Sequence, residues 1–348
     1  MVKIIDSCEN QVKRYMKCIV SLILFSFIFT IASAQSKWAE NGLVKPRIRV
    51  IIDNDFGGDP DGLFHLAQQL LSPSAEVRGV VCSHHYRDFY GSSGNVATAK
   101  EQVDGLLGVM QMSNVPVFLG SDSTMTAIDK PLDSEGARMI IAEAMRDDKR
   151  PLYILCGAGL TNIASAYLLE PRIAERIRAV VWIGGVEYPE LCRNWLQRQR
   201  EYNQGIDRIS AQVVFNHSTL PLWQFPRDVY RQALYSLAEL RWRVGQAGPV
   251  GEYLMARLED LLRRAKGQLG EAYVLGDSPL VLATALQSAW ESDAASCEYV
   301  TRPTPRINDR GFYEDNPEGR PIRVFTCIDT RLMLEDLVAK LKLQKQTH

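Results

Sequence analysis

The chain has 348 residues, 46% of them hydrophobic, which is enough to build one large α/β domain or two ordinary ones. Its 40 Lys and Arg residues nearly balance 41 Asp and Glu residues, so the formal net charge is -1. Proteins that bind nucleic acid usually carry a basic excess, and because this chain has none we expect no nucleic-acid partner.

Residues 1–34 are predicted to be a signal peptide. Basic residues between positions 13 and 17 precede an apolar run over residues 18–31, and Ala32-Ser33-Ala34 forms a small-residue cleavage site. The apolar run is short for a membrane span, and an uncleaved anchor helix is the alternative. We therefore expect an exported protein, periplasmic or secreted, with no stable membrane association after cleavage.

Five cysteines remain in the predicted mature chain. They are far apart, odd in number and without C-x-x-C spacing, which argues against a zinc site and against a dense disulfide framework. A single disulfide stays open, and the sequence does not indicate its pairing. These cysteines are Cys82, Cys156, Cys192, Cys297 and Cys327.

The first half of the mature chain alternates short β-branched runs with helical patterns. This alternation predicts a largely parallel sheet covered by helices. In such sheets the ligand binds beyond the carboxyl ends of the strands, so the residues after each strand are the candidates for function. The predicted strands span residues 47–53, 77–82, 115–119, 152–155 and 179–183, and the predicted helices span 63–71, 97–110, 135–146 and 162–169.

The second half of the chain is less regular. Residues 187–212 mix aromatic and polar side chains and predict no regular element. Further on, the pattern predicts three helices and one late strand, at residues 237–243, 253–266, 280–290 and 322–326. There is no internal repeat and no interdomain linker. We therefore expect residues 35–348 to form a single domain.

A cluster of acids follows the first predicted strand. Four aspartates occur within nine residues, and three glycines, two between the acids and one directly after them, allow the backbone to turn tightly. Like charges at this density are unfavourable unless a cation offsets them, and carboxylates without thiols favour Ca²⁺ or Mg²⁺. A solvated acidic turn is the alternative. An EF-hand fits less well, because this segment has no Glu at the position that closes such a loop. The four acids are Asp53, Asp55, Asp59 and Asp61.

This loop and four later segments resemble, in the same order, the conserved blocks of the inosine–uridine-preferring nucleoside hydrolases. The resemblance implies an open Rossmann-like α/β domain with a mostly parallel central sheet flanked by helices. It also implies that a calcium-bound water hydrolyses the N-glycosidic bond of a nucleoside, which releases base and ribose. The five blocks are residues 53–62, 155–164, 170–185, 201–207 and 276–280.

The resemblance assigns a Ca²⁺ site at the bottom of the pocket. Asp55 matches the aspartate that binds the ion and takes the proton of the attacking water. Asp277 matches a late ligand, and Cys156 stands where the family offers a backbone carbonyl. Asp59 and Asp61 are expected to share metal ligation and binding of the ribose hydroxyls, with Asp61 placed in both roles and the division left open.

The same resemblance assigns the substrate contacts. Glu201 and Asn203 match residues that bind the sugar hydroxyls, and Asn194 is a candidate near the 5′-hydroxyl. His84 and His85 follow a predicted strand and are candidates for activating the leaving group. The substrate implied is a small nucleoside or ribosyl compound, and because relatives are commonly dimers or tetramers the resemblance also implies a homo-oligomer.

Three departures from the family pattern keep alternatives open. Gly276 stands where many members carry a leaving-group histidine, and Gly62 stands where a second loop aspartate is usual. The segment after Gly79 lacks the family's asparagine. A sugar-binding member without nucleosidase activity, or a hydrolase of another glycosyl compound, is therefore the main alternative. A Mg²⁺-dependent phosphohydrolase is the third.

Overall fold

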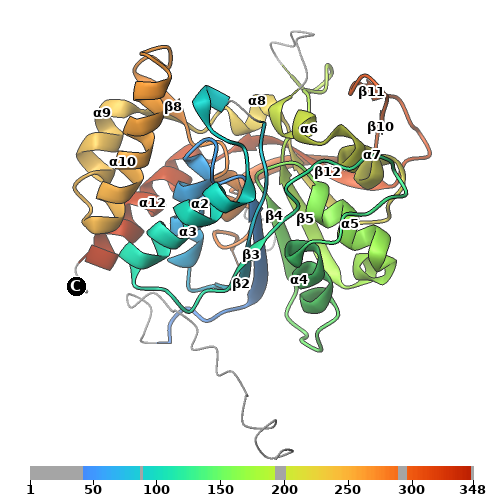
Figure 1. Ribbon diagram of the computed structural model, residues 1–348, viewed down its shortest axis with the longest axis horizontal. Helices are drawn as coiled ribbons and strands as arrows, with labels where there is room; N and C mark the ends of the chain where they lie inside the picture. The colour runs from blue at the N-terminus through green and yellow to red at the C-terminus, as the bar shows by residue number, and fades with distance from the viewer. Residues whose placement is uncertain (1–41, 87–88, 193–200, 289–295, 346–348) are drawn as a thin grey trace, which may run out of the picture. The chain divides into compact units, whose positions relative to one another are not determined.

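The computed structural model describes residues 42–86, 89–192, 201–288 and 296–345. Its centre is an eight-stranded sheet in the order β3-β2-β1-β4-β5-β6-β12-β9 (Figure 1). Neighbouring strands are parallel except at the edge, where β9 is antiparallel to β12. The strands are β1 (Ile48–Asn54), β2 (Ala75–Cys82), β3 (Val117–Leu119), β4 (Leu152–Cys156), β5 (Ile177–Ile183), β6 (Leu222–Phe225), β9 (Cys297–Pro303) and β12 (Pro321–Ile328).

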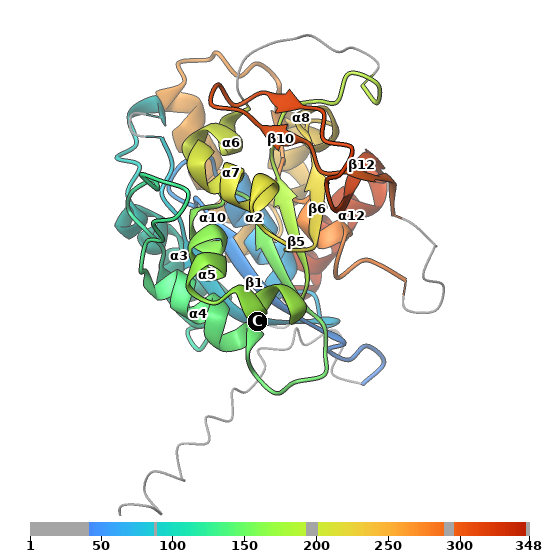
Figure 2. The same ribbon diagram turned by 90° about the vertical axis from the view of Figure 1, so that its right-hand side faces the viewer.

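Helices cover both faces of this sheet (Figure 2). One apolar core lies under α2 (Asp61–Leu70), α3 (Val96–Met110), α10 (Pro249–Arg264) and α12 (Thr330–Lys345). A second core lies under α4 (Glu135–Ala144), α5 (Thr161–Leu169) and α7 (Arg208–Asn216) on the other face. Burial on both sides explains why β1 reads as a continuous apolar run and not as an alternating one.

Short elements connect this frame. Two small antiparallel pairs lie outside the main sheet: β7 (Leu234–Ser236) with β8 (Ala272–Val274), and β10 (Arg306–Ile307) with β11 (Tyr313–Glu314). The remaining short helices are η2 (Phe89–Gly91), η3 (Pro171–Glu175), α6 (Tyr202–Ile206), α8 (Arg227–Tyr230), α9 (Leu237–Glu239), η4 (Leu240–Val244) and α11 (Pro279–Leu282). No helix in the described part of the chain is long and apolar enough to cross a membrane.

The predicted fold class is confirmed, and the predicted elements of the first half all occur with small shifts at their ends. The irregular segment predicted over 187–212 is wrong in its last part, where α6 and α7 form. The helix predicted over 280–290 is also wrong in length, because α11 ends at Leu282. Side chains of Gln287 and Ser296 donate to the Leu282 carbonyl, which a longer helix would use for its own backbone.

All five cysteines of the described chain are free thiols.

The strand order places a crevice next to β1. From β1 the chain moves outward to β2 and β3 and then returns to β4 on the opposite side of β1. Loops that leave β1 and β4 therefore diverge in opposite directions, and the space between them at the carboxyl edge is where such sheets bind ligands. Asp53 at the end of β1 is in register with Cys156 at the end of β4, so both loops start at the same level.

Candidate active site

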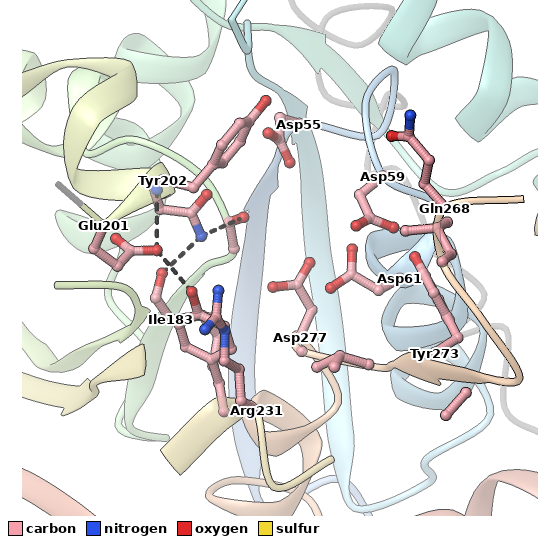
Figure 3. Close-up of a pocket in the computed structure, with 17 residues that line it drawn as sticks. Asp55, Asp59, Asp61, Ile183, Glu201, Tyr202, Arg231, Gln268, Tyr273 and Asp277 are labelled. Carbon is pink, nitrogen blue, oxygen red and sulfur yellow. Dashed lines mark hydrogen bonds between the residues drawn. The ribbon is translucent and has the colours of Figure 1, made fainter. Parts of the chain in front are cut away.

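A cavity of about 430 Å³ opens at this carboxyl edge. Its walls come from segments far apart in the sequence: the acidic loop with the start of α2, the start of α6, the end of α8, and residues 268–277 around β8 (Figure 3). A backbone hydrogen bond from Leu275 to the Ala233 carbonyl, at 2.9 Å, ties the β8 segment to the chain just after α8. The cavity is therefore assembled by tertiary pairing and not by one local motif.

Four carboxylates form one wall, which we call the acidic wall: Asp55, Asp59, Asp61 and Asp277 (Figure 3). The backbone turns at Gly58, whose N–H donates to the Asp55 carbonyl at 2.9 Å, and this turn brings the start of α2 back beside the end of β1. Asp277 reaches the same place from the turn between β8 and α11. The acids predicted from the first loop and from the late block thus meet, as expected.

Burial and mutual repulsion make ionisation of the acidic wall unfavourable. Loss of solvation, followed by the charges of neighbouring aspartates, holds the pKa of Asp55, Asp59 and Asp277 well above the ordinary value. Loss of solvation also raises the pKa of Asp61 to about 7, although backbone N–H groups of Gly62, Asp277 and Gly276 lower it in part. Such a wall needs protons or a cation to offset its charge.

The donors of the acidic wall fit a hard divalent cation. They are all carboxylate oxygens, and Asp59 Oδ1 is buried without a hydrogen-bond partner among the described residues. Within the described ranges no group of three acid, histidine or cysteine side chains forms a closed metal-binding cluster. The fit therefore rests on the chemistry of the donors and on the uncompensated charge. Cys156, a predicted carbonyl ligand, ends β4, and its neighbour Gly157 is the residue that lines the cavity.

The opposite wall carries Glu201 and Asn203. The Glu201 carboxylate caps α6 and accepts four hydrogen bonds, from the backbone N–H groups of Gly185, Asn203 and Gln204 and from the Tyr230 hydroxyl, at 2.8–3.1 Å. A carboxylate offers about four acceptor positions, so the protein already uses all of them. Burial raises the pKa of Glu201 despite these donors.

Asn203 is oriented by its own amide group. Its side-chain nitrogen donates to the carbonyl oxygens of Gly157 at 3.1 Å and Ile183 at 2.8 Å, which are the first residue after β4 and the last residue of β5. Both N–H donors are therefore engaged with backbone. The side-chain carbonyl oxygen is the part of Asn203 left to accept a hydrogen bond from a ligand.

The third side of the cavity was not predicted from the sequence. Tyr230 is the last residue of α8, Arg231 follows it, and Gln268 and Tyr273 come from the β8 segment. Figure 3 places Arg231 between the Glu201 side and Asp277. No motif surrounds these residues, so only the hydrogen-bonded pairing of β7 with β8 reveals that they share a cavity.

Comparison with known proteins identifies the family of this chain. The family model for inosine-uridine preferring nucleoside hydrolase matches residues 50–311. The chain belongs to the inosine-uridine preferring nucleoside hydrolase family. Two curated relatives carry the same description. The one from Leishmania major is 28% identical over 217 residues, 61% of this chain and 62% of that protein. The one from Crithidia fasciculata is 33% identical over 105 residues, 29% and 31% of the two chains.

Solved nucleoside hydrolase structures share the fold of this family member. A plant nucleoside hydrolase superposes with a TM-score of 0.66 at 18% identity, over 85% of this chain and 99% of that one. A purine-preferring ribonucleoside hydrolase from Gardnerella vaginalis superposes with a TM-score of 0.63 at 18% identity, over 86% and 100%. The curated relatives are matched over less than two thirds of their length, whereas these structures are matched almost completely.

The predicted histidines of this nucleoside hydrolase family member do not line the cavity. His84 Nδ1 lies 2.9 Å from the Ser121 carbonyl oxygen. His85 Nδ1 lies 2.6 Å from the Tyr86 carbonyl oxygen, and its Nε2 lies 3.0 Å from Ser92 Oγ. Both imidazoles are buried, and His85 lies beside Gly57 and Gly58 of the acidic loop. His84 Nε2 is buried without a hydrogen-bond partner among the described residues. Asn194, predicted near the 5′-hydroxyl, lies outside the described residues.

Proposed function

We propose that this chain hydrolyses the N-glycosidic bond of nucleosides, with Ca²⁺ held at the acidic wall. The observation that carries the proposal is the meeting of four carboxylates, from two distant family blocks, across one cavity from Asn203. Asp55 and Asp277 are buried, and Asp59 and Asp61 are partly buried. Asp55, Asp59, Asp61 and Asp277 supply only oxygen donors, which suit Ca²⁺. The names of the family and of the curated relatives support the same substrate class.

The residues divide the reaction between them. When bound, Ca²⁺ supplies positive charge that orients the attacking water and lowers its pKa. Asp55 takes the proton of that water as its oxygen bonds to the anomeric carbon. Asp59 or Asp61, together with the Asn203 carbonyl, fixes the sugar hydroxyls. The carbon–nitrogen bond breaks, and the base leaves with the electron pair and later takes up a proton.

Leaving-group activation falls to the third side of the cavity. The described part of the cavity contains no imidazole, and Gly276 offers no side chain to donate a proton. Arg231 is the cation of this wall, although its side chain is exposed, and a positive charge there would stabilise negative charge that develops on a departing base. We expect bases that carry negative charge readily to be the better substrates.

The test is release of ribose from a panel of purine and pyrimidine nucleosides, with Ca²⁺ or with EDTA. Asp55→Asn is the decisive variant, because it keeps the shape of the side chain and removes the base. Asp315→Asn, which alters an exposed carboxylate, is its control. Release that needs both Ca²⁺ and Asp55 supports the proposal. Equal release by wild type and Asp55→Asn would refute the assigned role of Asp55.

The sugar hydroxyls provide an independent check. A buried hydrogen-bond partner left unpaired costs about 1–3 kcal/mol, so 2′-deoxynucleosides should be poor substrates. Comparable turnover of adenosine and 2′-deoxyadenosine would contradict binding of the 2′-hydroxyl by the acidic wall and Asn203.

A second candidate function is binding of a ribosyl compound without hydrolysis. It is favoured by the positions of His84 and His85 outside the cavity lining and by the full hydrogen-bond occupancy of Glu201. A nucleoside that raises the melting temperature in Ca²⁺ but releases no ribose would favour this function. Inhibition by phosphate esters together with activation by Mg²⁺ would instead favour a phosphohydrolase.

We further propose that the protein is exported and cleaved before Gln35. The support is the basic segment, apolar run and Ala32-Ser33-Ala34 site in the sequence. N-terminal sequencing of the protein recovered from its host tests this. Recovery of an intact N-terminus from the membrane fraction would favour the anchor helix instead.

A further inference from the structure

Asn54 connects two members of the acidic wall, Asp55 and Asp277, through its side chain. It follows Asp53 in β1 and is fully buried. Its side-chain oxygen accepts a hydrogen bond from the Asp55 backbone N–H at 2.7 Å, and its side-chain nitrogen donates to Asp277 Oδ2 at 2.8 Å. One carboxamide therefore links the start of the acidic loop to a carboxylate 223 positions later in the chain.

The surrounding backbone is shaped around this carboxamide. A Cβ atom at Gly62 would lie 2.9 Å from Asn54 Nδ2, with the carboxamide carbon and oxygen at 3.1 Å. A Cβ atom at Gly157 would come closer still to the same amide and would also meet Asp277. Gly62 has no left-handed backbone angle that would require glycine. The reason for glycine at position 62 is therefore the Asn54 side chain and not the local backbone.

We infer that Asn54 is a positioning residue: it holds Asp277 and the Asp55 backbone in the geometry that receives the cation, and Gly62 and Gly157 are small to make room for it. The inference rests on the proposed function only in naming Asp55 and Asp277 as ligands. An amide suits this place better than a carboxylate, because its N–H donor meets an acceptor on Asp277. A hydrogen bond to a ligating carboxylate fixes its direction, and removing such a partner typically weakens metal affinity ~10–100-fold.

The inference predicts that the effect of Gly62→Ala on the melting temperature depends on whether Asn54 is present, which a double-variant cycle measures. Gly62→Ala should lower the melting temperature in the wild-type background, because the new methyl group meets the Asn54 carboxamide. In an Asn54→Ala background the same substitution should leave the melting temperature unchanged or raise it, because alanine is favoured over glycine inside α2 once space is free. The cycle is measured in EDTA with the full mature chain, so it does not depend on any ion. Equal effects of Gly62→Ala in the two backgrounds would overturn the inference.

The second measurement is calorimetric titration with Ca²⁺ alone. Asn54→Ala should bind Ca²⁺ ~10–100-fold more weakly than wild type. Asn54→Asp keeps the shape but places an acceptor against Asp277, so its melting temperature should fall in EDTA and recover when Ca²⁺ is added. The matched control is Asn216→Ala, which removes two hydrogen bonds with Ile307 away from the cavity. It should lower stability without changing Ca²⁺ affinity.

The outcomes separate this inference from the proposed function. Unchanged Ca²⁺ affinity in Asn54→Ala, or an equal loss in Asn216→Ala, would overturn the positioning role. If wild type binds no Ca²⁺, the proposed cofactor fails, while the cycle of Asn54 and Gly62 in EDTA still decides whether the two positions are coupled. If Ca²⁺ binding responds as expected but no nucleoside is hydrolysed, the positioning role stands and the proposed activity fails.

Discussion

Removing one charge from the acidic wall should stabilise the metal-free protein and destabilise the Ca²⁺-bound form. Asp61→Asn is the test, because burial raises the pKa of Asp61 from 3.8 to about 7. For an acid with a raised pKa the folded state holds its proton longer than the unfolded state. Stability is therefore lost as pH rises from about 4 to 7, and the full penalty applies above pH 7. The difference corresponds to about 4 kcal/mol at pH 8.

Asparagine at position 61 removes this penalty but also loses the favourable interaction of the negative charge with the N-terminus of α2. Asp61 is the first residue of α2, where a negative charge gains about 0.3–1 kcal/mol from the helix dipole, and its Oδ1 accepts the Gly62 N–H at 2.9 Å. The net gain expected for Asp61→Asn in EDTA at pH 8 is therefore roughly 2–4 kcal/mol. The gain should shrink as the pH falls toward 4, because wild-type Asp61 then becomes neutral.

The assay is urea unfolding of wild type, Asp61→Asn and the control Asp315→Asn, at pH 8 and pH 5, each in EDTA and in Ca²⁺. The variant should be more stable than wild type in EDTA at pH 8 and should gain less from Ca²⁺. The exposed control should change neither quantity. A variant less stable than wild type in EDTA at pH 8 would refute the argument that the acidic wall carries uncompensated charge.

Three further predictions concern groups around the cavity and in the core. Arg231→Gln should lower kcat ~10-fold or more, most for bases that carry negative charge poorly, and leave the Ca²⁺-induced rise in melting temperature unchanged; steady-state kinetics across the nucleoside panel measures it. Glu201→Gln replaces one acceptor oxygen of the carboxylate by an NH₂ donor, which cannot accept the hydrogen bonds of that oxygen, and should lower the unfolding free energy by about 2–4 kcal/mol. An unchanged unfolding free energy would show that these hydrogen bonds do not stabilise the fold. Burial lowers the pKa of His65 to about 3, so as the pH falls the unfolded chain takes up a proton on His65 before the folded chain does. The unfolding free energy of wild type should therefore fall by about 2 kcal/mol between pH 7 and pH 5, and His65→Leu should not show this loss.

The central sheet and the first-loop part of the acidic wall could be predicted because their signals are local. Buried parallel strands read as continuous apolar runs, and the acids of the first loop follow β1 directly. The carboxyl ends of parallel strands meet at one edge, so a strand followed by acids places those acids at the ligand site. Asp55 and Asp277 lie far apart in the sequence, and only the family blocks in common order indicate that they meet.

The histidines show the limit of the same rule. His84 and His85 also follow a central strand, β2, and the rule placed them at the pocket. Position after a strand sets the level of a residue but not the direction of its side chain. Here the carbonyl oxygens of Ser121 and Tyr86 lie within hydrogen-bond distance of the two rings, and such partners belong to loops that the sequence pattern does not place.

The residues on the third side of the cavity could not be predicted from the sequence, for a related reason. Tyr230, Arg231 and Tyr273 enter the cavity because β8 pairs with β7 and because Leu275 bonds to the chain after α8. Strands of three residues carry almost no periodic signal, and their pairing depends on contacts with the rest of the domain. Residues at the sheet's carboxyl edge can therefore be assigned from sequence, whereas the residues that cover the cavity cannot.

The hydrogen bonds of the two walls indicate which groups remain for a substrate. Glu201 is fully engaged by protein donors, and the amide hydrogens of Asn203 are engaged by β4 and β5. On that side the Asn203 carbonyl oxygen is left for a sugar hydroxyl. The acidic wall is the opposite case, since its carboxylates have more charge than the protein neutralises. Sugar binding should therefore depend mainly on the cation and the aspartates. Preference among bases should depend on Arg231 and the β8 segment. Substitutions there should change substrate preference without changing Ca²⁺ affinity.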